Sequence, residues 1–256
     1  MFVDASGDAD LCFLAGEETE SLDSNVLAGW FYYLTGDELV RAPLSHRYHA
    51  QGAREGAAGP FFRGDDAREV NAQLLGSRGL IRHKLDELRA RDPQKEIEPV
   101  MAPTLPCLRM TRRLCVPRAM QAAQVCHTWL DDTVGLISDW RRAGPVYAVP
   151  LGALVAERTV NLLAVGRCLA ADVTIWDVTR ALPGCVVSGE AAGTAAAVAL
   201  QASGGDLHRI AVPELQRQLR SQGVLLDPAL LTPSAPVTRP PATSIGAANS
   251  EDDKVG

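Results

Sequence analysis

Residues 161–168, with the sequence NLLAVGRC, decide the fold of this chain. The run is almost continuously apolar up to Val165 and ends in a Gly-Arg pair, as in a strand that is buried on both faces of a parallel sheet. A loop with the sequence WDVTRALPGC follows at 176–185, and the sequence SGEAAGTAA at 188–196 then opens a helix of small residues. This order of strand, loop and helix predicts an α/β fold.

The helix that begins near residue 186 has the composition of a ligand-contacting helix. Gly189, Ala192, Gly193 and Ala196 give it a flat face on which a strand or a planar ring can pack closely. Its N-terminus offers unpaired N–H groups and a partial positive charge, which together bind anions. The sequence therefore predicts a ligand site where this helix starts.

Two further stretches carry possible site residues. The chain opens with residues 2–5, read as the end of a buried strand, and continues into a Ser-Gly-Asp turn at 6–8 whose glycine lets the backbone approach a ligand. Most such turns are only turns. Residues 139–149, DWRRAGPVYAV, have the pattern of a polar loop that enters a strand.

The remaining elements follow from periodicity and composition. Apolar residues from Val70 to Leu88 recur at helical spacing, and Asp92 before Pro93 ends that helix. Further helices are expected over 186–202 and 213–222. The stretch from Pro228 onward, rich in Pro, Ser, Thr and Asp, predicts a disordered tail.

Composition limits the classes of protein that fit. Hydrophobic residues make up 46% and charged residues 22%, and the net charge is −6, so nothing favours binding to nucleic acid or to an anionic membrane. The six cysteines form no Cys-x-x-Cys pair, so no metal site is expected and the thiols are expected to be reduced. Without a signal sequence, and with the apolar window 185–202 too short and polar for a bilayer, we expect a cytoplasmic protein.

The stretches at 4–10, 139–149 and 161–196 together resemble one family, the FAD-dependent oxidoreductases with a glutathione-reductase-like FAD-binding fold. The opening resembles the family's Asp-Ala-Thr-Gly-Asp turn, with Ser6 in place of threonine. The later stretches are similar to its strand–Gly-Arg-Cys–loop–Arg-x-x-Pro–Gly-x-Ala-Ala-Gly-x-Ala-Ala signature. Residues 108–113 also resemble its Arg-x-Thr-Arg-Arg segment. With the loop at 139–145, the resemblance covers most of residues 1–226.

The resemblance implies a partial Rossmann-like FAD-binding domain from residues 1–16 and 147–226, an inserted α+β substrate or cap domain from 17–146, and a disordered tail at 227–256. It also implies that the Gly-Arg strand end lies near the flavin ribityl chain and that the following helix points its N-terminus at the pyrimidine edge of the ring. A reduced flavin carries negative charge there, which helix N–H groups stabilise. The cofactor-binding residues so implied are Ser6, Gly7, Gly166, Arg167, Cys168, Arg180, Cys185, Val186, Gly189 and Ala192.

The implied function is hydride transfer between a small organic substrate and flavin N5, with FAD as cofactor. Three features depart from the family: Gly184 in place of threonine, Glu190 in place of glutamine, and residues 115–117 in place of a Gly-Glu pair. The family's N-terminal Gly-x-Gly-x-x-Gly segment, which holds the pyrophosphate, is absent from the 256 residues. The sequence thus predicts a truncated, C-terminal portion. The alternative is a non-catalytic remnant that binds no FAD alone or pairs with another chain.

Several side chains keep two interpretations. Arg167 and Arg180 are ligands of flavin or substrate, or solvated charges. The cluster of Arg109, Arg112 and Arg113 binds an acidic substrate group or pairs with the surplus of Asp and Glu. His46 and His49 are proton donors or surface residues, and no catalytic acid or base is identified. Cys168 and Cys185 are expected to be small packing residues.

Overall fold

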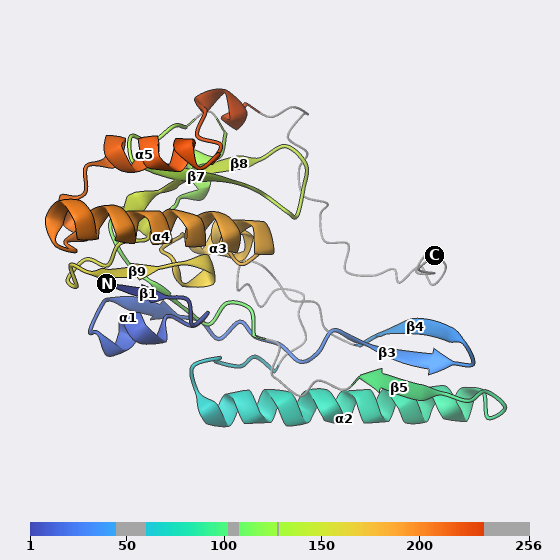
Figure 1. Ribbon diagram of the computed structural model, residues 1–256. Helices are drawn as coiled ribbons and strands as arrows, with labels where there is room; N and C mark the ends of the chain where they lie inside the picture. Colours follow the sequence, from blue (N-terminus) through green and yellow to red (C-terminus); the bar gives the residue numbers. More distant parts are fainter. Residues whose placement is uncertain (45–59, 102–107, 127, 233–256) are drawn as a thin grey trace. The chain divides into compact units, whose positions relative to one another are not determined.

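The computed structural model describes residues 1–44, 60–101, 108–126 and 128–232 (Figure 1). These residues form two compact units, each described here by itself. The first unit draws on residues 1–21 and 112–232, and the second on residues 22–111. Both units combine helices with small sheets of two or three strands, so the mixed α/β class is confirmed.

The first unit holds most of the secondary structure. Its strands are β1 (Phe2–Asp4), β2 (Thr19–Ser21), β6 (Arg112–Leu114), β7 (Thr133–Ser138), β8 (Val146–Pro150) and β9 (Leu162–Ala164). Its α-helices are α1 (Asp10–Leu14), α3 (Val173–Thr179), α4 (Leu182–Ser203) and α5 (Val212–Ser221). Its 3-10 turns are η1 (Ala122–Gln124), η2 (Leu151–Ala153), η3 (Gly166–Cys168), η4 (Leu207–Arg209) and η5 (Pro228–Leu231).

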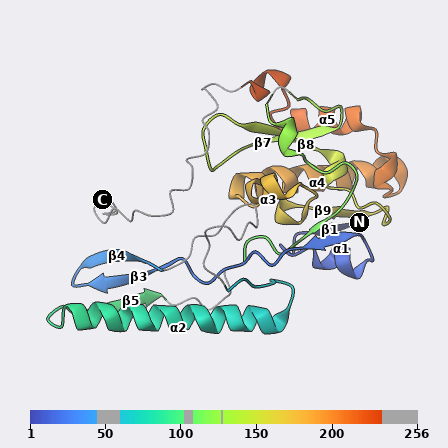
Figure 2. The same cartoon turned by 180° about the vertical axis from the view of Figure 1, so that it is seen from behind.

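The strand quoted at the outset is β9, and it pairs in parallel with β1, with Val3 opposite Leu163. All three residues of β9 are buried, as its apolar sequence predicts. In both views α4 lies between the β7–β8 hairpin and the β1–β9 pair, with α1 on the opposite side of that pair (Figures 1 and 2). Helices thus lie on both sides of the pair, although Phe2 and Val3 of β1 stay exposed, and the pair carries the turns that hold the predicted site.

Helix α4 is longer than the sequence analysis expected. It starts at Leu182, with Pro183 in its first turn, and ends before Gly204, which takes the left-handed conformation (φ 66°) that favours glycine. By length and composition α4 could cross a membrane, so the expectation that it is too short is wrong. The core helix of a folded domain can have the same length and composition, and Ala191, Ala192 and Ala195 of α4 are buried inside the unit.

The second unit packs one long helix against an antiparallel sheet. The sheet runs β4 (Glu38–Pro43), β3 (Trp30–Thr35), β5 (Glu98–Met101), and the helix is α2 (Ala67–Arg91). The Asp66 side chain caps α2 by accepting hydrogen bonds from two backbone N–H groups. Ile81 and Leu85 form a core with Phe31 of β3, which confirms the predicted helical face.

The structure bears on the predictions made for β1, for the C-terminal tail and for the domain boundaries. β1 is a strand but not a buried one, because Phe2 and Val3 are 56% and 41% exposed and, within the described ranges, only β9 pairs with it. Residues 228–231, which were expected in the disordered tail, form η5, in which Leu231 is buried; residues 233–256 lie outside the described part. The compact units divide at 21/22 and 111/112, because β6 pairs with β2 and β7 packs on α4. The assignment of residues 1–16 and 147–226 to an FAD-binding domain and of 17–146 to a substrate domain stays a prediction.

Candidate functional site

The turn after β1 is organised by a buried carboxylate. Asp4, 1% exposed, accepts hydrogen bonds from the N–H of Ser6 at 3.0 Å, the hydroxyl of Ser6 at 2.7 Å and the N–H of Cys12 at 2.9 Å. Burial by itself raises the Asp4 pKa, but these hydrogen bonds outweigh it and hold the pKa below its ordinary value. Ser6 in turn accepts the N–H of Asp10 at 3.0 Å. The Ser6 hydroxyl is therefore engaged within the turn.

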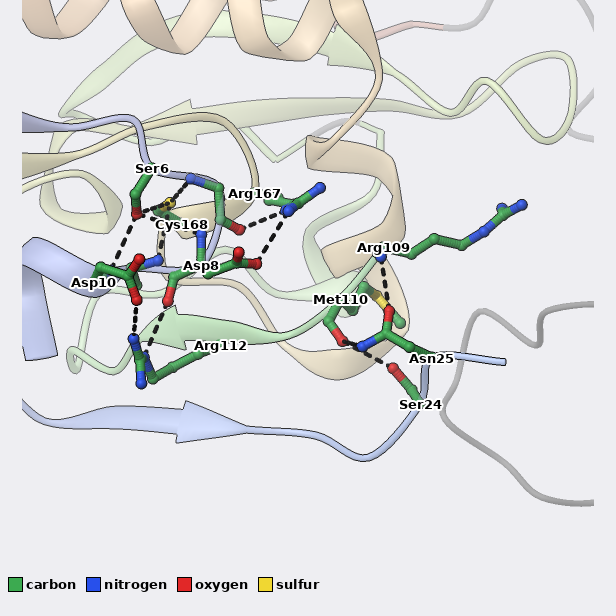
Figure 3. A network of polar contacts seen from close by, with 12 residues as sticks. Ser6, Asp8, Asp10, Ser24, Asn25, Arg109, Met110, Arg112, Arg167 and Cys168 are labelled. Carbon is green, nitrogen blue, oxygen red and sulfur yellow. Dashed lines mark hydrogen bonds and ion pairs between the residues drawn. The ribbon is translucent and has the colours of Figure 1, made fainter. Parts of the chain in front are cut away.

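Cys168 holds the same turn from η3. Its Sγ accepts hydrogen bonds from the N–H groups of Gly7 at 3.2 Å and of Ala9 at 3.3 Å, and Ala9 takes the left-handed conformation (φ 50°) (Figure 3). Burial is the main cause that raises the Cys168 pKa to about 11. The thiol is thus protonated at neutral pH and serves as a buried acceptor, in line with the packing interpretation.

Two arginines fix the other side of the turn. Arg167 donates from Nε to the carbonyl oxygen of Gly7 at 2.5 Å and pairs with Asp8 at 3.0 Å. Gly7 has φ +86°, and a Cβ placed on it would lie 2.9 Å from the Arg167 guanidinium. Arg112 of β6 donates to the Asp8 carbonyl at 3.0 Å and pairs with Asp10 (Figure 3). The space over Gly7 is therefore filled by Arg167.

The end of β9 is joined to the start of α4. Gly166, in the left-handed conformation (φ +61°), donates its N–H to the Ser188 hydroxyl at 2.9 Å. A Cβ on Gly166 would lie 3.2 Å from the Sγ of Cys185, so no larger residue fits there without a shift. Burial raises the Cys185 pKa, and the nearby charge of Arg167 offsets part of that rise. Ser188 was not predicted as a site residue, although it stands within the quoted small-residue stretch.

The first turns of α4 are open on one side. The N-cap residue Ala181 supplies no side-chain hydrogen bond to the helix, and Leu182 and Val186 are 82% and 67% exposed. A Cβ on Gly189 would meet nothing within 4 Å. Ala192, by contrast, is fully buried and lies on the inner face. Of the predicted residues on α4, Val186 and Gly189 thus border the open side and Ala192 does not.

Arg180 lies just before α4 and belongs to a second cluster. Its Nε donates to Oδ1 of the buried Asp177 at 2.5 Å, and its guanidinium carbon lies 5.2 Å from the centre of the Trp140 ring. The indole N–H of Trp140 donates to the Asp177 carbonyl at 3.0 Å. Trp140 stands in the polar loop of residues 139–149 and was not among the predicted cofactor-binding residues. The only sequence feature that pointed to Trp140 was a large aromatic residue in a polar loop, and its position beside Arg180 follows from the tertiary structure.

The loop that carries Trp140 is anchored by Asp139, whose side chain is fully buried. Arg141 donates to it at 2.8 and 3.0 Å, and Arg142 at 3.2 Å. Burial raises the Asp139 pKa, but the hydrogen bonds and charges of Arg141 and the charge of Arg142 outweigh it and lower the pKa below its ordinary value. The loop is therefore held by a charge network rather than by apolar packing.

The remaining candidates take other places. Arg112 and Arg113 pair with Asp10 and Glu20, so the pairing interpretation is confirmed for them. The backbone N–H of Arg109 donates to the Asn25 side chain in the second unit (Figure 3). His46 and His49 lie outside the described residues. In the part of the chain that the structure describes, no group of three or more His, Cys, Asp or Glu side chains could hold a metal ion.

Comparison with known proteins relates part of this chain to one protein family. The model of the family described as FAD dependent oxidoreductase matches residues 131–219, from just before β7 to α5. The matched segment contains the predicted residues from Gly166 to Ala192, together with Trp140, and excludes Ser6 and Gly7. The chain therefore contains part of an FAD-dependent oxidoreductase domain, as the resemblance predicted. No curated protein and no solved structure matches the chain.

Proposed function

We propose, from this family relationship, that the first unit is a partial Rossmann-like FAD-binding domain that contacts the flavin ring at the start of α4. The observation that carries the proposal is the open first turn of α4. It has no side-chain cap, its Leu182 and Val186 are exposed while Gly184 is buried, and it follows the tightly joined β9–Gly166 turn inside the segment that matches the family. A helix start of this kind offers N–H donors and a partial positive charge to an anionic ligand edge.

The described residues fit the ring side of the cofactor. Gly189 and Gly193 leave open space beside α4, and Val186 adds an exposed apolar side chain. Arg180 places a cation next to the helix start. The pyrophosphate side has no matching loop, because the 256 residues contain no Gly-x-Gly-x-x-Gly sequence. The proposed contact is therefore confined to the flavin ring and the atoms next to it.

A bound flavin supplies hydride acceptance and donation at N5, here in exchange with a small organic substrate. This chain's contribution is binding and charge stabilisation. In the first turn of α4, Pro183 has no N–H and the N–H of Cys185 already donates to the Ala181 carbonyl at 3.0 Å, so the N–H groups of Leu182 and Gly184 would hydrogen-bond a ring carbonyl oxygen. Arg180, held in place by Asp177, adds a fixed positive charge on the same side. Both groups favour an electron-rich ring over a neutral one.

A flavin titration with matched arginine variants tests the proposal. Arg180, the C-cap residue of α3, and Arg217, within α5, each pair with an acidic residue three positions earlier, but only Arg180 adjoins the start of α4. We expect riboflavin to bind the 256-residue chain weakly, and Arg180→Gln to weaken that binding about 3- to 10-fold, the effect of 0.7–1.4 kcal/mol. Arg217→Gln should bind as the unchanged chain does. Absence of saturable riboflavin binding would refute the proposal.

A second candidate function is pairing with another chain without catalysis, and the free edge of β1 favours it. Phe2 and Val3 point to opposite faces of the strand, and both are exposed. Exposed apolar edges of this kind are sites of strand addition. If self-association at β1 is the function, Val3→Lys should convert a concentration-dependent oligomer into a monomer in sedimentation measurements. The riboflavin titration should be unchanged in that variant.

A further inference from the structure

Trp140 combines exposure with a fixed position. Its side chain belongs to a residue that is 51% exposed, whereas Trp176, four residues before Arg180, is fully buried in the core. The Trp140 indole N–H is bound to the Asp177 carbonyl at 3.0 Å, and the Arg180 guanidinium lies over its ring at 5.2 Å. An indole held at two points yet left half open is an unusual use of a large apolar side chain on a protein surface.

The loop under Trp140 is also fixed. Arg141 donates from Nε to the Asp139 carboxylate and from Nη1 to the Thr174 carbonyl of α3 at 3.1 Å. The loop is thereby tied to the helix that precedes α4. Because the indole is already ordered, a ligand that stacks on it loses little of its binding free energy to side-chain ordering.

The positive charges near Trp140 favour a ligand that carries negative charge. Arg141 and Arg142 pair with the buried Asp139, and Arg180 pairs with the buried Asp177, so three guanidinium groups are held in fixed positions in this cluster. The uncapped start of α4, two residues after Arg180, adds the positive end of a helix. The surface therefore suits a planar aromatic ring that carries negative charge on one edge.

We infer that Trp140 is a ring-contacting residue of the flavin site, and that its open face stacks on the flavin ring while Arg180 covers its other face. The inference rests on the proposed function and adds to it a residue that the family resemblance did not supply. Stacking of an aromatic ring adds to the affinity gained by the burial of apolar area. Trp140 is thus expected to determine a measurable part of the affinity for the ring alone.

Riboflavin is the appropriate probe, because it contains the ring without phosphate or adenine. We would titrate the full 256-residue chain and its Trp140→Ala, Trp140→Phe and Trp30→Ala variants, following both flavin and tryptophan fluorescence. Trp30 is the matched control, since it is 47% exposed and lies in the second unit. We expect Trp140→Ala to raise the Kd about 3- to 10-fold, Trp140→Phe to restore most of the affinity, and Trp30→Ala to leave the Kd unchanged.

The outcomes separate the two levels of the argument. If the unchanged chain binds riboflavin and Trp140→Ala binds equally well, the inference is wrong and the proposed function stands. If the unchanged chain binds no riboflavin, both are wrong. If Trp140→Ala fails to fold, as judged by its thermal transition, the stacking contact is tested instead by comparing the tryptophan emission of Trp140→Phe with that of the unchanged chain as riboflavin is added. Loss of the riboflavin-quenched part of that emission supports the stacking contact, and an unchanged quenched part overturns it.

Discussion

The backbone N–H of Gly7 donates a hydrogen bond to the Sγ of Cys168 at 3.2 Å, although 161 positions separate the two residues. A second N–H, that of Ala9, reaches the same sulfur at 3.3 Å. The bond joins the turn after β1 to the end of β9, the two strands of the parallel pair. Gly7 and Cys168 were both expected to contact a cofactor, and the structure shows that each already stabilises the other.

Replacement of this sulfur should destabilise the first unit. Cys168→Ala leaves the N–H groups of Gly7 and Ala9 without an acceptor in a buried place, which costs about 1–3 kcal/mol. Urea unfolding would measure the change in free energy, and hydrogen exchange at the two amides would locate it. Cys115→Ala, at a half-buried thiol for which burial likewise raises the pKa, is the control and should change stability little.

Substitution of Gly7 should cost more than substitution of a comparable glycine. Gly7 and Gly16 have similar backbone conformations, φ +86° and +80°, so alanine is strained at both by about 1 kcal/mol. Only at Gly7 would the new Cβ also press on Arg167, 2.9 Å away. We expect Gly7→Ala to lower the free energy of unfolding more than Gly16→Ala. Equal losses would show that Arg167 moves aside freely.

Stability should depend on pH through Asp139. Its pKa is below the ordinary 3.8 in the folded chain, despite the opposing effect of burial. A carboxyl group with a depressed folded pKa stabilises the fold above its unfolded pKa, and that stabilisation is lost as pH falls through the folded pKa. Asp139→Asn should therefore lower the free energy of unfolding by about 3 kcal/mol at pH 7, as loss of one partner from a buried ion pair does.

The difference between Asp139→Asn and the unchanged chain should shrink as pH falls below the ordinary value of 3.8 and through the lower folded pKa, because Asp139 is protonated first in the unfolded chain and then in the folded one. Urea unfolding at a series of pH values would measure it. The exposed Asp131 in the same unit supplies the control, and Asp131→Asn should have little effect at any pH. A difference for Asp139→Asn that stays constant down to pH 2 would mean that the ion pairs with Arg141 and Arg142 contribute nothing.

The 256-residue chain, produced by itself, should purify without tightly bound FAD. The cofactor carries two anionic phosphates, and no Gly-x-Gly-x-x-Gly loop is available in this sequence to bind them. Ring contacts alone must offset the cost of association. Absorbance near 450 nm, roughly where oxidised flavin absorbs, measures the bound fraction. A yellow preparation with one FAD per chain would contradict this expectation.

The sequence alone determined the elements whose signals are local. The apolar run before Gly166 predicted β9, the periodicity from Val70 to Leu88 predicted α2, and the small-residue stretch predicted α4. Each is set by the chemistry of residues within a few positions of one another. The resemblance to the oxidoreductase family likewise depended on contiguous residues, and the family match covers the segment that carries its longest motif.

Tertiary structure decided everything that depends on distant partners. Hydrogen bonding placed Cys168 under Gly7, and an ion pair held Arg167 over it, so a glycine expected to admit a ligand instead admits an arginine. Among the described residues β1 pairs only with β9, and its Phe2 and Val3 are exposed where the sequence predicted burial. Trp140 gained its place beside Arg180 only when the β7–β8 loop packed on α3. Local sequence cannot specify such contacts, because their energies arise between segments that only the folded chain brings together.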